Sequence, residues 1–511
     1  MQSLAQPVPL SRPETLERLG SDTFDVLVIG GGIVGAGTAA LAARQGLNVA
    51  LVERADFGSG TSSASSKLIH GGLRYLRMGD VRLVREALRE ARILRRVVAP
   101  HLVRELPFVL PVYRDGPYGR TAIGAGLALY AALTGSVRSR GRLVSPTRAA
   151  ELVPLLQLDD LAAAGLYADA ETNDARLCLA NVTAAAESGA AVVGRVEAVG
   201  IERGRVTLRD LLGGGSFEAS ARTVVNASGA SVDAVRRLED PRAGTSVALS
   251  KGAHLVLDRP GDWGAALTIP VDRTRVSFAI PWQGLLLLGT TDTPFEPGET
   301  LEPTAADEAQ ILAEAARALP PEALRPEAIR ARFAGLRVLP LDDKVTDCHK
   351  PGSTAPLRRE VTISRGPLGV VSVAGGKLTT HRAIARSALG RLRGDLGLHR
   401  IDRTPFPLPG AAEPAAVAAE LEHVEPELAL HLARTYGERA ADLLNHARGR
   451  DDALEPLAPG ALDVVAQAVW ARDREWALEP EDVLRRRTTL ALRGLDSPAV
   501  HELFAGPVAA R

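Results

Sequence analysis

Cysteine is almost absent from this chain, which has 511 residues and two cysteines, Cys178 and Cys348. Two cysteines cannot form the disulfide framework of a secreted scaffold, so we expect a reducing compartment. An excess of charge of one sign is also absent, because the formal net charge is +0 at pH 7. No global field would attract a nucleic acid, so we predict no nucleic-acid partner. Separately, we predict no metal site.

Long apolar runs are missing too. No stretch approaches the ~20 apolar residues of a membrane span. Residues 1–20 lack the apolar core of a signal peptide. We expect these 20 residues to form a loose arm. The longest apolar candidate is AIGAGLALYAALTG at 122–135. It is interpreted either as a buried helix or as a segment at a membrane surface, because Arg138, Arg140 and Arg142 follow it.

Lysine is rare, because nearly all the basic residues are arginine. Lysine offers a compact point charge that arginine does not copy. A specific role is therefore favoured for the lysines that remain, which are Lys67, Lys251, Lys344, Lys350 and Lys377.

The residues that are present predict a nucleotide-binding βαβ unit near the N-terminus. Residues 25–29 (DVLVI) are typical of a buried parallel strand, residues 33–46 of a small-residue helix, and residues 47–54 of a second strand. The turn between the first strand and the helix has the GxGxxG pattern, in which Gly30 permits the tight turn, Gly32 lets the backbone approach a pyrophosphate, and Gly35 lets helix and strand pack closely. Glu53 ends the next strand at the spacing expected for a ribose 2′-hydroxyl acceptor, which disfavours NADP.

Two later segments favour FAD over NAD. NASGA at 226–230 follows a predicted strand, and in two-dinucleotide-domain flavoproteins such a strand returns beside the cofactor. AGGKLTT at 374–380 places a glycine pair before another helix, whose N-terminus can stabilise negative charge on a reduced flavin. A nicotinamide enzyme needs no such second site.

The remaining pattern predicts the domain organisation. Short alternating runs at 190–225 and 245–292 indicate strands, and residues 412–511 are rich in Ala, Leu, Glu and Arg, which indicates helices. We predict an α/β protein with a Rossmann-type FAD-binding domain, an antiparallel-sheet substrate domain and a C-terminal all-α domain. The predicted boundaries are an N-terminal arm at 1–20, an oxidoreductase region at 21–407 with interleaved subdomains, and a helical domain at 408–511.

A dense set of motifs resembles the FAD-dependent glycerol-3-phosphate dehydrogenase family, within the D-amino-acid-oxidase-like flavoproteins. The motifs are DVLVIGGGIVGAG, TSSASSKLIHGGLRYL, DARLCLAN, KGAHLVL, LLGTTD, GLRVLP, GGKLTT and RRRTTL, and they span roughly residues 22–500. The resemblance implies non-covalently bound FAD. The cofactor contacts that it implies are Gly30, Gly31, Gly32, Gly35, Glu53, Arg54, Thr61, Ser62, Ser63, Ser66, Lys67, Leu68, His70, Gly71, Gly72, Val196, Ala227, Gly229, Gly376, Leu378 and Thr379.

The resemblance also implies the reaction, oxidation of sn-glycerol 3-phosphate to dihydroxyacetone phosphate. Such a substrate needs cations for its phosphate and a base for the C2 hydroxyl proton. The candidate cations are Arg74, Arg337, Arg359 and Lys377. His70 and His254 compete for the role of base, and Tyr75 could hydrogen-bond a substrate oxygen.

Plainer interpretations of these residues stay open. His254 lies on an apolar strand and could be a core histidine, and His70 could contact only the flavin. In a chain this rich in arginine, any single arginine could be an ordinary surface charge. Asp174, Asp292 and Cys178 are interpreted as structural.

The family resemblance further implies a quinone acceptor, and hence a cytoplasmic protein attached peripherally to the inner face of the cytoplasmic membrane. A homodimer is left open. The alternatives are an oxidase that passes electrons from glycerol 3-phosphate to oxygen, an amine or amino-acid oxidase of the same superfamily, and a non-catalytic flavin-binding protein.

Overall fold

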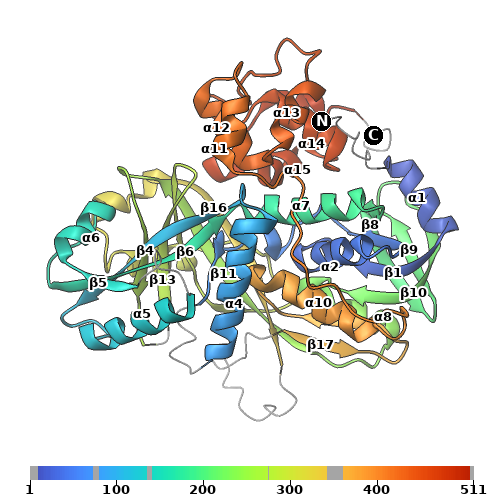
Figure 1. The fold of residues 1–511 in the computed structure, drawn as a ribbon, viewed down its shortest axis with the longest axis horizontal. Helices are drawn as coiled ribbons and strands as arrows, with labels where there is room; N and C mark the ends of the chain where they lie inside the picture. Colours follow the sequence, from blue (N-terminus) through green and yellow to red (C-terminus); the bar gives the residue numbers. More distant parts are fainter. Residues whose placement is uncertain (1–9, 73–79, 135–140, 274, 342–360, 507–511) are drawn as a thin grey trace.

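In this computed structural model the described residues are 10–72, 80–134, 141–273, 275–341 and 361–506. Two sheets lie side by side, and a helical domain covers one edge where they meet (Figure 1). The α/β class, the antiparallel-sheet domain and the C-terminal helical region predicted from the sequence are confirmed.

The first sheet holds the predicted βαβ unit. Its strand order is β17-β18-β10-β1-β2-β7, with β8 and β9 attached at β10, and β10, β1, β2 and β7 run parallel. Helices α2, α7 and α10 pack together over one face (Figure 1). The bounds are β1 Thr23–Ile29, α2 Ile33–Arg44, β2 Val49–Val52, α7 Asp174–Glu187, β7 Ala191–Val193, β8 Val196–Glu202, β9 Arg205–Asp210, β10 Ser216–Asn226, α8 Val232–Glu239, β17 Thr362–Arg365, β18 Val371–Ala374 and α10 His381–Leu392.

The second sheet is mainly antiparallel, with the order β15-β11-β14-β13-β12-β4-β6-β3, β16 paired to β11 and β5 paired to β6. Strand β11 is buried along most of its length, and Ala253, Leu255 and Leu257 belong to the apolar core of this sheet. The bounds are β3 Leu68–Ile69, α4 Val81–Ile93, β4 Val103–Tyr113, α5 Arg120–Thr134, β5 Arg142–Val144, α6 Pro146–Leu152, β6 Leu161–Thr172, β11 Val247–Asp258, β12 Ala266–Pro270, β13 Val276–Trp282, β14 Leu285–Gly289, β15 Thr293–Phe295, α9 Ala305–Ala315 and β16 Ile329–Pro340.

The C-terminal helices have apolar cores of their own and sit above α7 (Figure 1). Their bounds are α11 Pro414–Glu420, α12 Pro426–Tyr436, α13 Arg439–His446, α14 Val465–Arg474, α15 Pro480–Asp482 and α16 Pro498–Leu503. A short π-helical turn, η7 Val483–Arg487, follows α15 and faces α7.

The N-terminal segment requires a correction. Residues 1–20 are expected to be a loose arm, but Arg12–Ser21 form helix α1, which packs on β7 and β10. Ser11 and Glu14 form a capping box, which satisfies amides at the helix start. Leu19 is fully buried, and Arg12 pairs with Asp210, so both apolar and ionic contacts hold the helix down.

Within the described ranges, no helix has both the length and the hydropathy of a membrane span. The segment at 122–135 mostly falls in α5, which buries Leu127 and Tyr130 but exposes Ala125 and Leu129. Of the three arginines expected after it, Arg142 is exposed, while Arg138 and Arg140 lie outside the described residues.

Candidate active site

A cavity of about 1620 Å³ lies between the two sheets, at the carboxyl ends of β1, β2, β10 and β18. Parallel strands present their carboxyl ends to one edge of a sheet, and ligands of α/β proteins bind at that edge. The antiparallel sheet supplies the opposite wall through β6, β11 and β16. The cavity therefore joins the predicted nucleotide site to the predicted substrate domain.

The glycine-rich turn has the close packing that its motif requires. Gly30 has a φ of +108°, and a Cβ atom there would lie 2.6 Å from the Ala227 carbonyl oxygen. A Cβ atom on Gly35 would lie 1.9 Å from the Gly30 carbonyl oxygen. Gly32 lies at the N-terminus of α2 and lines the cavity, so the first turn of that helix faces the space where a pyrophosphate would sit.

Glu53 lies at the end of β2 with its carboxylate in the cavity wall. One carboxylate oxygen accepts the Gly31 amide at 2.6 Å and the other accepts the Ala55 amide at 2.8 Å. Burial raises the pKa of Glu53, and these two amides act in the opposite direction. The backbone thus fixes the carboxylate in position to accept hydroxyl groups.

The second glycine pair follows β18, two strands away from β1 in the same sheet, and also lines the cavity. Gly375 and Gly376 both have positive φ, at +78° and +109°, and the chain then enters α10 through a short helical turn. Thr379 in that turn accepts a hydrogen bond from the His70 amide at 3.1 Å. This contact joins the TSSASSKLIHGGLRYL segment to the helical turn that leads into α10.

Some of the predicted cofactor contacts line the cavity, and others do not. Thr61, Ser62, Ser66, Leu68, His70 and Gly72 line the cavity, as do Arg54, Val196, Ala227, Gly229, Gly376 and Leu378 among the predicted cofactor contacts. The predicted contacts that do not line the cavity are Gly31, Gly35, Ser63, Lys67 and Gly71.

The side chain of Lys67, one of the predicted cofactor contacts, has structural partners. Its side chain is buried, and its ammonium group donates to Asp174 and to the Ser63 carbonyl oxygen, both at 2.6 Å. The side chain therefore holds the segment to α7 and does not reach the cavity. Lys251 is similarly engaged, with Asp307 at 2.7 Å, so two of the rare lysines form buried structural ion pairs.

His254 projects from β11 to the cavity wall and is 3% exposed. Its Nε2 atom lies 2.9 Å from the Ser66 hydroxyl, and its ring stacks on Phe333 with centroids 4.8 Å apart. Burial lowers the pKa of His254 to about 3, and the nearby Arg337 charge adds to the effect. The imidazole is therefore neutral near pH 7 and can accept a proton.

Arg337 reaches the same region from β16. Its guanidinium donates to the Thr290 hydroxyl at 3.0 Å and lies 3.7 Å from the Asp292 carboxylate. A Cβ atom on Gly252 would lie 2.7 Å from this guanidinium, so a side chain there would displace the arginine from its present position. Asp292, which the sequence suggested was structural, thus helps to orient a predicted substrate cation.

Lys377 and His70 also line the cavity, whereas Arg74, Tyr75 and Arg359 lie outside the described residues. The structure thus brings His70, His254, Arg337 and Lys377 to one space. Their roles stay predictions.

Sequence reasoning missed Asp169, which also lines the cavity. Burial raises the pKa of Asp169 to about 7. The available signal was a carboxylate in the otherwise apolar stretch LAAAGLYADA, because such a residue on a core strand usually has specific partners.

The residues around the cavity fit FAD. A glycine cradle, a fixed carboxylate for a ribose, and two helix N-termini that line one cavity match the groups of a dinucleotide flavin. FAD would be held by the turn 30–35, by Glu53 and by the second glycine pair.

Fold and site together define an FAD-dependent oxidoreductase, and a family model with the description "FAD dependent oxidoreductase" matches residues 25–386. A second model, "C-terminal domain of alpha-glycerophosphate oxidase", matches residues 404–502. Curated relatives narrow the class. The chain is 35% identical to "Glycerol-3-phosphate dehydrogenase" of Synechocystis sp. over 92% of this chain and 89% of that one. It is 36% identical to "Glycerol-3-phosphate dehydrogenase 2" of Mycobacterium tuberculosis, over 96% and 85%. The chain belongs to the glycerol-3-phosphate dehydrogenase family.

Solved structures agree. The glycerol-3-phosphate dehydrogenase from Bacillus halodurans, complexed with FAD, superposes with a TM-score of 0.74 at 26% identity, covering 93% of this chain and 88% of that chain. The L-alpha-glycerophosphate oxidase from Mycoplasma pneumoniae shares the fold, with a TM-score of 0.59 at 16% identity, covering 76% and 99%. The predicted resemblance and the predicted FAD cofactor are confirmed.

Proposed function

We propose that this protein oxidises sn-glycerol 3-phosphate to dihydroxyacetone phosphate and passes the electrons to a quinone. The observation that carries the proposal is the pairing of an oriented cation with a neutral histidine, Arg337 and His254, on one cavity wall. The relatives named glycerol-3-phosphate dehydrogenase support the same reaction. FAD, when bound, supplies the acceptor for the hydride that leaves C2 of the substrate and the route to a second acceptor.

Arg337 and Lys377 bind the phosphate in this proposal. An arginine suits a phosphate because two of its N–H groups can donate in parallel, and Thr290 and Asp292 hold the guanidinium in one orientation. Lys377 adds a point charge from the opposite wall, next to the second glycine pair. The phosphate then fixes the C2 carbon between the two walls.

His254 takes the C2 hydroxyl proton, with His70 as the competing base. The low pKa of His254 arises from burial first and from Arg337 second. A phosphate beside Arg337 offsets the guanidinium charge, so the substrate itself raises the proton affinity of the histidine. The Ser66 hydroxyl on Nε2 and the Phe333 ring keep the imidazole in one orientation during the transfer.

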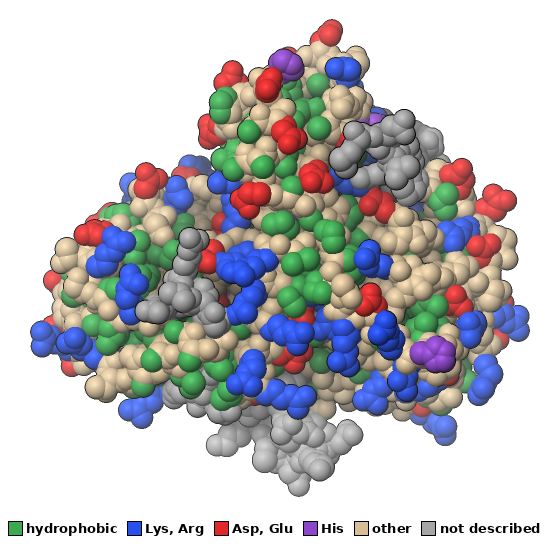
Figure 2. Space-filling model, viewed as in Figure 1, with side chains coloured by type: hydrophobic (Ala, Val, Ile, Leu, Met, Phe, Trp, Pro, Cys, Tyr) green, Lys and Arg blue, Asp and Glu red, His purple; other side chains and the backbone are tan. Residues whose placement is uncertain are grey.

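A quinone acceptor requires contact with a lipid bilayer, and two neighbouring helices offer a surface for it. Helix α5 exposes Ala125 and Leu129, the latter at 44%. Helix α4 packs beside α5, and Figure 2 shows basic side chains gathered over α4 and α10. On α4 and the turn after it, the exposed arginines lie three or four positions apart and so share one helix face. They are Arg82, Arg85, Arg89, Arg92 and Arg96, which we call the arginine stripe. We propose peripheral attachment through this stripe and the exposed face of α5.

An anaerobic spectrum tests the function. The oxidised flavin absorbance of the purified protein should bleach on addition of glycerol 3-phosphate, and it should not bleach with a panel of amino acids. Bleaching by an amino acid and not by glycerol 3-phosphate would contradict the proposal. Mixing the bleached protein with a short-chain quinone or with oxygen then identifies the acceptor, because the physiological acceptor restores absorbance within the turnover time. Restoration by oxygen as fast as by quinone would favour an oxidase.

A further inference from the structure

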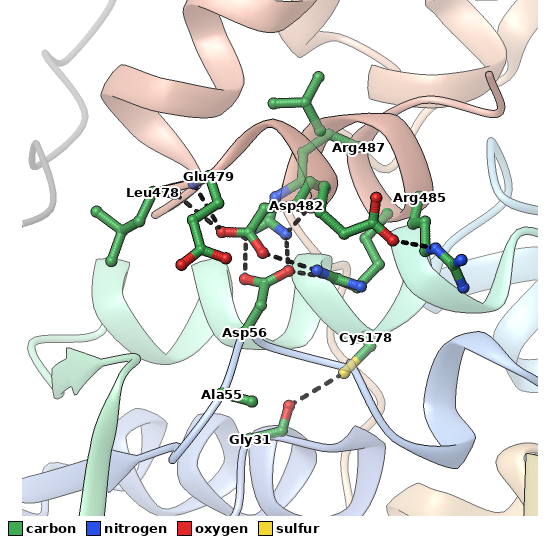
Figure 3. A network of polar contacts seen from close by, with 12 residues as sticks. Gly31, Ala55, Asp56, Cys178, Leu478, Glu479, Asp482, Arg485 and Arg487 are labelled. Atoms are coloured by element: carbon green, nitrogen blue, oxygen red, sulfur yellow. Dashed lines mark hydrogen bonds and ion pairs between the residues drawn. The ribbon is translucent and has the colours of Figure 1, made fainter. Parts of the chain in front are cut away.

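A group of buried charges lies where the C-terminal domain meets the nucleotide-binding sheet (Figure 3). Asp56 is its centre and is 3% exposed. The carboxylate accepts from the guanidinium groups of Arg486 and Arg487, which are 430 and 431 residues away in the chain. Arg486 also donates to Asp482 at 2.7 Å. A buried carboxylate needs such partners, because an unpaired charge in the interior is strongly unfavourable.

Arg487 is fully buried at this contact. Its side chain has 0% exposure, and its second donor group lies 2.8 Å from the other Asp56 oxygen, which makes the pair bidentate. Burial alone would lower the pKa of Arg487, but the carboxylates of Asp56, Asp482 and Glu475 together outweigh it and raise the pKa. Arg487 also donates to the Glu475 carbonyl oxygen, which ties the pair to the end of α14.

Asp56 belongs to the loop that follows β2, and this loop forms part of the cavity wall. Glu53, Arg54 and Ala55 line the cavity directly before it. Phe57 follows it, and a Cβ atom on Gly31 would lie 2.4 Å from the Phe57 ring, so the ring backs the glycine turn. The same ring contacts Trp476 of the C-terminal domain in a T-shaped arrangement, with centroids 5.6 Å apart.

A second loop on the cavity wall is held from the same domain. Arg195 donates to Asp482 and to Glu479, both at 3.0 Å. Its own amide donates to the Ala55 carbonyl oxygen at 3.1 Å, and the next residue, Val196, lines the cavity. Asp482 therefore pairs with Arg195, which lies in the second loop, and with Arg486, which pairs with Asp56 in the first loop.

We propose that the C-terminal domain controls how tightly the protein retains FAD, through a latch formed by the ion pairs of Asp56 with Arg486 and Arg487 and of Arg195 with Asp482. These are positioning residues. Their side chains hold loops 53–58 and 194–196 against the cavity but do not line the cavity themselves. The proposal concerns the cofactor and holds whatever the substrate or the electron acceptor is. Because coupling is reciprocal, bound FAD should also hold the C-terminal domain in place.

The test follows FAD release from the full-length holoenzyme. The variants are Arg487→Met and the double variant Asp56→Asn with Arg487→Met, which leaves no unpaired buried charge. Free FAD fluoresces more strongly than bound FAD, so fluorescence after dilution reports the release rate. We expect release to become roughly 2- to 30-fold faster, the range for residues that couple two sites indirectly. Because Arg337 and His254 lie on the other sheet, KM for glycerol 3-phosphate at saturating FAD should stay within about 2-fold of wild type.

A matched control separates a latch from general loosening of the domain. Arg176 on α7 pairs with Glu475 at 2.7 and 2.8 Å, joins the same two domains and is similarly buried, but does not touch either loop. The double variant Arg176→Met with Glu475→Gln should lower the melting temperature and leave FAD release unchanged. If this control releases FAD as fast as the latch variants do, the latch is overturned.

A milder variant keeps the test decisive if Arg487→Met does not fold. Arg195→Met removes a contact at a side chain that is 13% exposed, and Asp482 keeps its pair with Arg486. It should also release FAD faster, and added FAD should slow trypsin cleavage between the domains less than in wild type. Release at the wild-type rate from every folded latch variant overturns the proposal, even if the variants melt at lower temperature.

Discussion

Tyr130 of helix α5 donates a hydrogen bond from its hydroxyl to the Asp169 carboxylate of strand β6 over 2.5 Å. The same carboxylate oxygen accepts the Gly71 amide at 3.1 Å. A Cβ atom on Gly71 would lie 2.4 Å from the Tyr130 hydroxyl oxygen, so the three groups are packed in contact. This carboxylate therefore joins α5, β6 and the segment that carries His70 at one corner of the cavity.

The first prediction concerns the pH dependence of stability. Burial raises the pKa of Asp169 to about 7, against about 3.9 in an unfolded chain. Between these values the folded protein keeps a proton that the unfolded chain has lost. The contribution of Asp169 to stability is therefore full below about pH 4 and is lost as the pH rises toward 7. Asp169→Asn cannot ionise, so its melting temperature should fall less than that of wild type between pH 5 and pH 7.5.

The control for this measurement is Asp262→Asn, because Asp262 is exposed. It should keep the wild-type dependence on pH. If Asp169→Asn shows the same slope as wild type, the carboxyl of Asp169 does not hold a proton in this range.

The second prediction concerns the phosphate. Arg337→Ala should lower kcat/KM for glycerol 3-phosphate by roughly 10- to 100-fold, because a hydrogen bond to a charged group contributes about 1.5–3 kcal/mol. FAD content should not change. Arg332 lies on the same strand but is exposed and paired with Glu308, so Arg332→Ala should keep wild-type kinetics. Unchanged kinetics in Arg337→Ala would remove that residue from the site.

The third prediction concerns the base. Loss of a general base typically lowers the rate by about 10²- to 10⁴-fold. His254→Asn should slow flavin reduction in stopped flow by this factor, while His70→Asn should act less strongly. Because the pKa of His254 is about 3, its ionisation should not appear in the pH profile of the free enzyme above pH 5. The reverse ranking of the two variants would assign the base to His70.

The fourth prediction is that FAD is bound without a covalent bond. A cysteinyl flavin needs a thiol in the cavity wall, and Cys178, the free cysteine of the described residues, lies elsewhere. Its sulfur donates to the Gly31 carbonyl oxygen at 3.4 Å, and burial raises its pKa far above the ordinary range. Acid precipitation should leave yellow FAD in the supernatant. Flavin that stays with the pellet would point to attachment through a histidine.

Local patterns allowed the nucleotide site to be predicted. The glycine turn and Glu53 lie within one βαβ unit, so their spacing alone determines the geometry that brings the Glu53 carboxylate to the Gly31 amide. The capping box of Ser11 and Glu14 was equally local and would have predicted helix α1.

Long-range pairing was not predictable in this way. The sequence suggests a special role for Lys67 but does not reveal Asp174, 107 positions later, as its partner. RRRTTL at 485–490 contributes to the family resemblance, yet the partner of Arg487 is Asp56, on the loop after β2. Asp169 meets Gly71 only because β3 pairs with β6. Such contacts depend on the order of strands and the docking of domains. The periodicity of apolar residues along the sequence does not predict either.

The fifth prediction concerns the membrane. An exposed arginine near anionic lipid contributes about 1 kcal/mol, and salt screens this attraction. The protein should float with vesicles that contain anionic lipid, and less so at high salt. The variant Arg85→Ser, Arg89→Ser, Arg92→Ser removes the centre of the arginine stripe and should float less. As a control, exposed Arg203 and Arg205, at the start of β9, and exposed Arg222 of β10 can be changed to serine, because β9 and β10 belong to the first sheet and not to α4 or α5.

The alternative contact follows α5, where Arg138, Arg140 and Arg142 can be changed to serine in a separate variant. In one outcome, the arginine-stripe variant floats as well as wild type while the variant at 138, 140 and 142 floats less. That outcome would place the lipid contact after α5 and not on α4. If the wild-type protein never floats and no quinone restores the absorbance of substrate-bleached enzyme, the membrane proposal fails. Oxygen then becomes the acceptor to test, because it reaches the cavity from solution and needs no lipid surface.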